Sequence, residues 1–360
     1  MNSIRIGSRE VGPGRPTYII AEVGSNFDHD LERAKSLAKL AKECGADAFK
    51  IQNFSAPKIV SNVGFSNLQV AFQAKWDKPV VDVYRAAEFP REWLKELADY
   101  CREIEIDFFS SPYDKEAVDQ LEAVGVPAHK MGSGEIDNLE FLGYVAKSGK
   151  PVLLACGAST MDEVGAAIKA VRDAGNENVI MLQCVTNYPS PIADANISAM
   201  NVIKDQFNVM VGYSDHTIGV EGGADDPLGG LTVPLAAVAL GATVIEKHFT
   251  DDRTRKGPDH PFAMEATMFK KMVEGIRALE KAMGDGQKRL MPSEKETVII
   301  QRRGIYAIQD IEPGQPLTRD MLEYLRPAVG LRPPAMPSIL GKTVNKKIVA
   351  GQPLRAEDIV

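Results

Sequence analysis

The chain has 360 residues, of which 44% are hydrophobic and 25% are charged, and its formal net charge at pH 7 is −7. This composition is typical of a globular protein, and the negative charge argues against a nucleic acid or an anionic membrane as partner. No apolar run is long enough to span a bilayer, and the first residues lack the apolar core of a signal peptide. We therefore expect a cytoplasmic protein with no membrane and no nucleic-acid partner.

Short apolar runs rich in β-branched residues alternate with amphipathic segments from residue 18 to about residue 285. Eight such runs predict an α/β fold of the closed (β/α)8 TIM-barrel type rather than a doubly wound open sheet. Helices are predicted at residues 31–43, 91–104, 161–174 and 263–283. The strands are predicted at residues 18–21, 48–51, 107–110, 128–131, 152–155, 179–183, 209–213 and 242–245.

The sequence changes character after the predicted barrel, which we place at residues 1–285. A polar, proline-containing segment indicates a linker at residues 286–300, followed by a small domain of short strands and turns at residues 301–360. A weak internal repeat in this domain relates residues 311–317 to residues 348–354. About 60 residues form only a small core, so we expect this domain to pack on the barrel or on another subunit.

Polar side chains gather where the predicted strands end, which is where parallel barrels build their active sites. The strand ends carry, in chain order, Glu22, Lys50 with Gln52, Ser111, Lys130 with Ser133, Thr186 to Tyr188, Ser214 with His216, and His248.

The two lysines suit an anionic ligand. Lys50 and Lys130, together with Ser133 and its flanking glycine amides, could hold a phosphate or a carboxylate. Alternatively, the lysines pair with Glu22 and Glu135 as structural salt bridges, because a buried lysine needs an anion nearby.

His216 and His248 each follow a predicted strand and are expected at the same level of the barrel. A single histidine at a strand end is often a hydrogen-bonded structural residue. Two of them, with Asp215 and Asp259 nearby in the sequence, favour a divalent metal site. Two imidazoles completed by water and a carboxylate suit Mn²⁺, Mg²⁺, Fe²⁺ or Co²⁺ better than structural zinc.

The motifs at these strand ends resemble, in order and spacing, those of the sialic acid (N-acetylneuraminate) synthase family. The resemblance covers nearly the whole chain, and the residues from Arg302 onward resemble the antifreeze-like (SAF, β-clip) domain of that family. The matching motifs lie at residues 20–26, 49–52, 130–135, 187–189, 212–217, 246–249 and 257–260.

The resemblance implies an enzyme that condenses phosphoenolpyruvate with N-acetylmannosamine, or a related 2-acetamido aldose, and water. The products would be a nine-carbon 2-keto sugar acid and phosphate. One alternative is the same reaction on a 2,4-diacetamido-6-deoxy sugar, which gives legionaminic or pseudaminic acid. The others are a barrel that has lost catalysis and a different barrel enzyme such as a class II-type aldolase.

The resemblance also implies roles for individual residues. Glu22 would handle protons during water attack, and Arg326 would enter the barrel of a partner subunit, which implies a domain-swapped homodimer. His216 and His248 would bind a divalent metal, with Mn²⁺ preferred and Mg²⁺ or Co²⁺ as alternatives. Lys50, Ser111, Lys130, Ser133 and Ser214 would hold phosphoenolpyruvate, and Gln52, Thr186, Asn187, Tyr188, Asp259 and Arg326 would position the sugar.

The chain departs from the family pattern in several places, and Thr186 stands where some members carry a different small polar residue. Phe27 and Asp28 stand where the family commonly has His-Asn, and residues 155–157 read Ala-Cys-Gly where it often has Ser-Thr-Gly. Residues 221–230 resemble an insertion, which we expect to be a surface loop or a lid beside the sugar pocket. These departures bear on the identity of the sugar more than on the reaction.

Overall fold

The computed structural model describes residues 3–68, 78–219 and 225–360. The chain divides into two compact units, Met1–Gly284 and Asp285–Val360, which are described separately.

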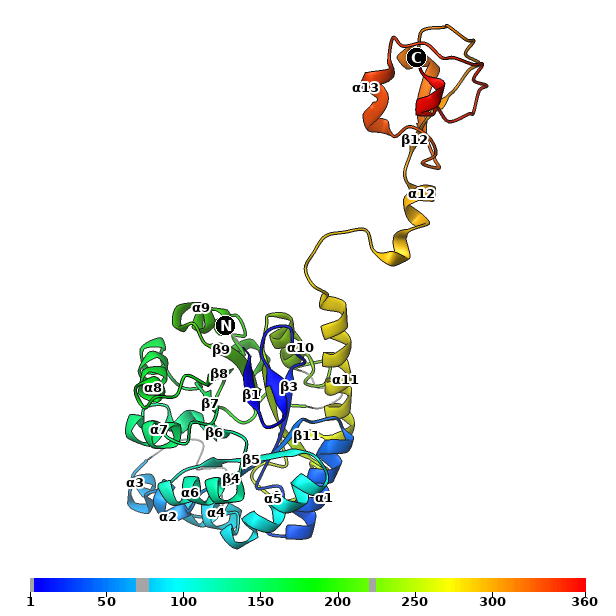
Figure 1. Ribbon diagram of the computed structural model, residues 1–360. Helices are drawn as coiled ribbons and strands as arrows, with labels where there is room; N and C mark the ends of the chain where they lie inside the picture. Colours follow the sequence, from blue (N-terminus) through cyan, green and yellow to red (C-terminus); the bar gives the residue numbers. More distant parts are fainter. Residues whose placement is uncertain (1–2, 69–77, 220–224) are drawn as a thin grey trace. The chain divides into compact units, whose positions relative to one another are not determined.

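The first unit is built on a ring of eight parallel strands (Figure 1). Hydrogen-bonded neighbours follow the order β5-β4-β3-β10-β9-β8-β7-β6, and β5 and β6 also lie in contact, so the barrel is nearly closed. This confirms the predicted (β/α)8 fold. The strands are β3 Tyr18–Gly24, β4 Ala48–Asn53, β5 Asp107–Pro112, β6 His129–Met131, β7 Val152–Ala155, β8 Val179–Cys184, β9 Met210–Asp215 and β10 Val244–Thr250.

The helices pack around the outside of this ring, with their apolar faces on the strands (Figure 1). Polar residues cap the N-termini of several of these helices. The Asp30 side chain accepts a hydrogen bond from the backbone amide of Arg33, and Thr160 forms a capping box with Glu163. Of the described residues, none belongs to a helix long and apolar enough to cross a membrane. The main helices are α1 Leu31–Glu43, α5 Leu94–Glu103, α6 Lys115–Val124, α7 Leu139–Ala146, α8 Met161–Asp173, α9 Ala199–Phe207, α10 Thr232–Ala239 and α11 Ala266–Met283.

Several elements differ from the prediction. The last barrel helix begins at Ala266 rather than at residue 263, because β11 Met264–Glu265 first pairs with β10. The hairpin of β1 Ile4–Ile6 and β2 Arg9–Val11 was not predicted. Three short helices also follow β4: α2 Ala56–Ile59, α3 Asn62–Ser66 and α4 Val80–Ala87.

The segment predicted as an insertion lies partly outside the described residues, which resume at residue 225. In the described part, the Asp226 carboxylate accepts hydrogen bonds from the amides of Leu228, Gly230 and Thr232. Asp226 is buried, and these contacts fix the turn that precedes α10.

The second unit has its own small core and an internal pseudo-symmetry. Strand β12 Gly304–Ala307 pairs antiparallel with β13 Leu322–Leu325, and short helices lie at α12 Thr297–Gln301 and α13 Met336–Ile339. The repeat noted in the sequence pairs with itself: Ile311 and Ile348, equivalent in the two copies, exchange reciprocal amide-to-carbonyl bonds of 2.8 and 3.0 Å.

Candidate active site

The polar residues at the strand ends meet at one level because neighbouring strands pair in register. Glu22 is opposite both His248 and Lys50, and Glu246 is opposite Ser214. Alternate residues of a strand point to the same side. Three pairs of residues therefore face the barrel interior together: Lys50 and Gln52 on β4, Ser214 on β9 with His216 directly after it, and Glu246 and His248 on β10.

Glu22 is the hydrogen-bond acceptor at the centre of this layer. Lys50 Nζ donates to Glu22 Oε2 (2.5 Å), and Gln52 Nε2 donates to Glu22 Oε1 (2.8 Å). Burial raises the pKa of Glu22 and the charge of Glu246 raises it further, while Lys50 opposes both. Glu22 is thus a carboxyl group that can carry a proton nearer neutral pH than an exposed glutamate.

Glu246 is a functional candidate that the sequence reasoning missed. Its Oε1 accepts from Ser214 Oγ (2.9 Å) and lies 3.4 Å from Lys130 Nζ, and its Oε2 lies 3.8 Å from Lys50 Nζ. Burial alone would raise the pKa of Glu246, but Lys130 and Lys50 outweigh it and lower that pKa. The signal was present in the sequence, since Glu246 stands two residues before His248 and so shares its side of the strand.

Both lysines form buried ion pairs, but only one has the partner expected from the sequence. Lys50 pairs with Glu22, as expected. Lys130 pairs with Glu246 and donates to the carbonyl of Met131 (3.1 Å), whereas Glu135 instead accepts from Asn138 (3.2 Å). Glu135 follows the end of β6 in a 3-10 turn, so it does not share the inward side of the strand with Lys130.

The two histidines lie side by side, with ring centroids 5.4 Å apart. His216 Nδ1 donates to the carbonyl of Val185 (2.7 Å), which leaves the Nε2 lone pair available. Burial lowers the pKa of His216 to about 4, and burial followed by the charge of His216 lowers the pKa of His248 well below its ordinary value. Both rings are therefore neutral at physiological pH, as metal ligation requires.

These rings fit a metal ion as donors, although they do not make a complete site. His248 Nδ1 is buried with no hydrogen-bond partner in the described part of the chain. The acids expected nearby point elsewhere: Asp215 pairs with Lys247 (2.6 Å), and Asp259 accepts from Ser25. Among the described residues no group of three histidine, cysteine or acidic side chains could hold a metal. A metal held here would keep positions open for substrate or water, as catalytic sites do.

Aromatic rings border the histidines. The Tyr188 ring centroid lies 4.3 Å from that of His216, and Phe262 packs against both His248 (4.9 Å) and Tyr188 (5.3 Å). Thr186 and Asn187 precede Tyr188 and are exposed, and Asn187 Nδ2 donates to the carbonyl of Pro189. Phe262 was not among the residues predicted from the sequence.

A second corner of the mouth brings small polar groups together. Ser133 Oγ lies 3.1 Å from Cys184 Sγ and accepts from the amide of Gly157 (3.0 Å). A β carbon on Gly157 would collide with Thr186 and Cys184, so glycine is required there. Ser111 is buried opposite Gln52 in the register.

Two comparisons decide the family. The NeuB family profile matches residues 37–288, well over half of the chain, and the SAF domain profile matches residues 302–360. The chain belongs to the NeuB family. The predicted resemblance to the sialic acid synthases is thereby confirmed.

Several relatives of this NeuB family member are named as synthases of different sugar acids. The pseudaminic acid synthase of Helicobacter pylori is 35% identical over 346 residues, which cover 96% of this chain and 98% of the relative. The N,N'-diacetyllegionaminic acid synthase of Campylobacter jejuni is 36% identical over 337 residues, which cover 92% and 97%. The crystal structure of an N-acetylneuraminic acid synthetase from Leptospira borgpetersenii has 31% identity and a TM-score of 0.71, covering 82% of this chain and 95% of that one.

The NeuB family member is therefore an enzyme of the nonulosonic acid synthase type, and the family does not support a non-catalytic barrel or a class II-type aldolase. Its SAF unit carries Arg326, which is exposed. The role predicted for Arg326 in a partner subunit stays a prediction.

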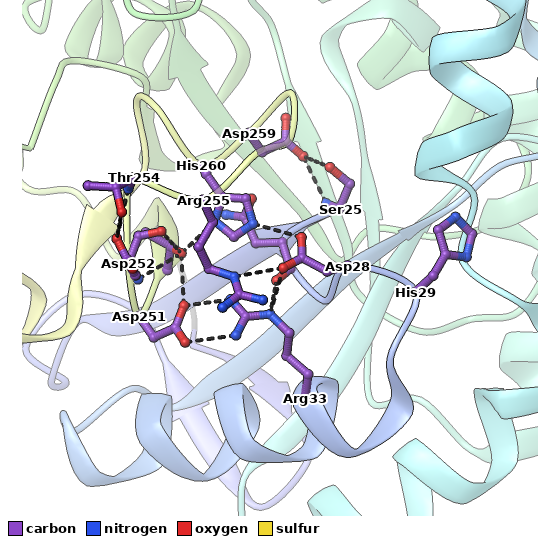
Figure 2. Close-up of polar contacts among 12 residues, drawn as sticks. Ser25, Asp28, His29, Arg33, Asp251, Asp252, Thr254, Arg255, Asp259 and His260 are labelled. Carbon is purple, nitrogen blue, oxygen red and sulfur yellow. Dashed lines mark hydrogen bonds and ion pairs between the residues drawn. The ribbon is translucent and has the colours of Figure 1, made fainter.

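The departures from the family pattern now have places in this NeuB chain. Phe27 is 1% exposed and packs on Phe89 (5.4 Å), so it belongs to the core. Asp28 instead makes polar contacts (Figure 2): Arg255 Nε (2.8 Å) and Arg33 Nε (3.1 Å) reach one carboxylate oxygen, and His260 Nε2 (2.9 Å) reaches the other.

This set of contacts holds the loop that carries Asp259. His260 is fully buried, with Nδ1 2.8 Å from Thr250 Oγ1, so it joins the end of β10 to the loop after β3. Asp259 Oδ2 then accepts from the Ser25 amide (2.8 Å) and hydroxyl (2.9 Å). Burial raises the pKa of Asp259. Figure 2 shows His29 turned away from this group.

Proposed function

We propose that the enzyme condenses phosphoenolpyruvate with a 2-acetamido aldose, N-acetylmannosamine being the leading candidate, and water. A carbon–carbon bond forms between the methylene carbon of phosphoenolpyruvate and the aldehyde carbon of the sugar. Water adds at the former enol carbon and phosphate leaves, so the products are a nine-carbon 2-keto sugar acid and phosphate.

The observation that carries this proposal is the layer of alternating charge at the barrel mouth. Lys50 and Lys130 are almost fully buried and are balanced by Glu22 and Glu246. Removing two lysines from water costs several kcal/mol each unless anions meet them. A phosphate and a carboxylate on one small substrate could replace the neighbouring acids as partners of these lysines, which makes phosphoenolpyruvate a suitable ligand.

The side chains divide the work by position. Lys50 and Lys130 hold the anionic groups and offset phosphate charge as the bond to phosphate weakens. Ser111, Ser133 and Ser214 supply hydroxyl donors around them. Glu22, whose pKa is raised, accepts the proton of the attacking water, while Lys50 and Gln52 fix the orientation of its carboxylate.

His216 and His248 would hold a divalent metal, for which Mn²⁺ suits the neutral imidazoles, with Mg²⁺ or Co²⁺ as alternatives. When bound, the metal would polarise the aldehyde oxygen of the sugar. The Val185 carbonyl fixes the tautomer of His216, so that Nε2 is left as the ligating nitrogen. Asp259, Tyr188 and Gln52 border the space in which the sugar would lie.

A second candidate sugar is a 2,4-diacetamido-6-deoxy aldose, as in legionaminic or pseudaminic acid synthesis. The contact of Phe262 with Tyr188 favours it, because these rings offer an apolar wall to a terminal methyl group. The named activities of the Helicobacter pylori and Campylobacter jejuni relatives also support it.

The test is phosphate release from phosphoenolpyruvate with Mn²⁺ and a panel of both kinds of sugar. We expect release that depends on one sugar class, stops after dialysis against a chelator and returns with Mn²⁺. Absence of release with every sugar, using metal-replete folded protein, would refute the synthase proposal. Release unaffected by the chelator would refute the metal proposal alone.

A further inference from the structure

Tyr113 is a phenol at the barrel mouth to which the proposed reaction gives no role. It follows Pro112, the last residue of β5, and has the same parity as Ser111 and Phe109. Strand β5 is in register with β4, so Tyr113 lies beside Phe54 just as Ser111 lies beside Gln52. Successive residues rise by about 3.3 Å, so Tyr113 stands about 6–7 Å farther toward the open end than Ser111.

Contacts on two sides fix the Tyr113 ring. Its centroid lies 6.0 Å from that of Phe54 in an edge-on arrangement, and Phe54 meets Tyr84 in the same way at 5.6 Å. The hydroxyl lies over the backbone of Gly132, where an added β carbon would be only 3.1 Å from Tyr113 Oη. Glycine at position 132 therefore leaves the space that the phenol occupies.

The hydroxyl is placed to donate to something other than the protein. None of the described residues accepts a hydrogen bond from it, although the side chain is only partly exposed. Burial raises the pKa of Tyr113, and the charges of Glu22 and Glu135 raise it further, so the phenol keeps its proton. The hydroxyl is therefore free to donate a hydrogen bond to a bound ligand in place of water.

We propose that Tyr113 is a specificity-determining residue whose hydroxyl donates a hydrogen bond to an oxygen of the sugar substrate, a hydroxyl or an acetamido carbonyl. This inference rests on the proposed function. The layer below, with Ser111, Lys50 and Lys130, takes the anionic substrate. Tyr113 is one layer nearer the mouth, where it forms an aromatic wall with Phe54 and Tyr84. The charge of Asp259 acts on this wall, since it raises the pKa of Tyr84 in addition to burial.

The test is Tyr113→Phe, which keeps the ring against Phe54 and removes only the hydroxyl. We expect KM for the sugar to rise about tenfold, which corresponds to one hydrogen bond, with KM for phosphoenolpyruvate unchanged. Gly132→Ala, which pushes on the hydroxyl, should raise KM for the sugar in the same direction. The control is Tyr144→Phe on α7, whose hydroxyl donates to Asp119 at the surface and which should change neither constant.

The outcomes separate this inference from the proposed function. If the wild-type enzyme releases no phosphate with any sugar, the proposed function fails and the assignment of Tyr113 fails with it. If the wild-type enzyme is active but Tyr113→Phe leaves KM for the sugar unchanged, only the inference is wrong. A rise confined to KM for phosphoenolpyruvate would also overturn it, because the hydroxyl would then serve the anionic substrate.

Discussion

At the scale of single residues, Glu246 supplies negative charge that balances the lysines of the barrel mouth. It is 4% exposed, pairs with Lys130 and lies near Lys50, and its Oε2 has no hydrogen-bond partner among the described residues. In the free enzyme this carboxylate neutralises the lysines that an anionic substrate needs. Glu246 therefore stabilises the fold and at the same time competes with the anion that Lys50 and Lys130 would bind.

The variant Glu246→Gln tests this competition. Loss of the negative charge leaves Lys130 with only the Met131 carbonyl, so we expect the free energy of unfolding to fall by about 2 kcal/mol. Phosphoenolpyruvate should then stabilise the variant more than the wild type, because the lysines lack their counter-charge. Thermal unfolding with and without phosphoenolpyruvate measures both effects.

The matched control is Glu135→Gln, the acid that the sequence analysis paired with Lys130. Glu135 contacts Asn138 and not Lys130, so the same substitution should leave both stability and the response to phosphoenolpyruvate unchanged. Equal behaviour of the two variants would contradict the role assigned to Glu246.

At this scale the sequence predicts which residues reach the site better than it predicts their partners. Lys50, Lys130, His216 and His248 all face the interior, because strand ends and pleat parity can be read along the chain. The partners depend on register between strands that are distant in sequence. The separation of Lys130 from Glu246, which are 116 positions apart, kept this pair out of the prediction.

At the scale of elements, polar contacts around Asp28 tie the loop after β3 to the loop after β10 (Figure 2). Arg33 on α1 extends this set to Asp251: its two terminal guanidinium nitrogens donate to the two carboxylate oxygens of Asp251 (2.8 and 2.6 Å). From the sequence, Asp28 was recognised only as a residue that differs from the family pattern. Two of its partners, Arg255 and His260, lie 227 and 232 positions away, so no local pattern could reveal these contacts.

We predict that Asp28→Ala loosens the loop that carries Asp259. The variant leaves buried His260 Nε2 without its acceptor and removes one of the anionic partners of Arg33, so the free energy of unfolding should fall by about 2–3 kcal/mol. KM for the sugar should rise while KM for phosphoenolpyruvate stays the same, and hydrogen exchange should increase at residues 251–263. Asp28→Asn keeps a hydrogen-bond acceptor, so its stability and its KM for the sugar should lie between those of the wild type and those of Asp28→Ala.

Asp252→Ala is the control for this prediction, because Asp252 is on the same loop but, among the described residues, its carboxylate accepts hydrogen bonds from Thr254 alone. It should leave both KM values and the exchange near Asp259 close to those of the wild type. Faster exchange confined to the mutated residue in Asp28→Ala would show that the contacts do not hold the loop.

For the whole molecule, the order of elements was more predictable than the small pairings that finish it. All eight barrel strands follow from apolar runs, because each is buried on both faces. The two-residue β11 and the hairpin β1–β2 are too short to show a period. In the second unit, the repeat seen in the sequence is a structural pseudo-symmetry: Gly314 donates to the Val344 carbonyl as Gly351 donates to that of Ala307.

The proposed domain-swapped homodimer makes a prediction about mixed subunits. If each active site combines one barrel with the partner's Arg326, Arg326→Ala leaves the barrel intact, and His248→Ala leaves the arginine intact. Each homodimer should be inactive. A mixed dimer contains one site with both groups and one with neither, so it should recover half of the wild-type activity per dimer. Subunits purified as verified mixed dimers through two different tags provide the measurement.

The control for this experiment mixes His216→Ala with His248→Ala. Both changes fall in the barrel, so every site in that mixture lacks one histidine and no activity should return. The informative result is recovery when His248→Ala is mixed with Arg326→Ala but not when it is mixed with His216→Ala. That result would place Arg326 in the active site of the other subunit, because no arrangement within a single chain produces the difference. No recovery in either mixture would mean that each chain uses its own Arg326 or none, and the shared site would have to be abandoned.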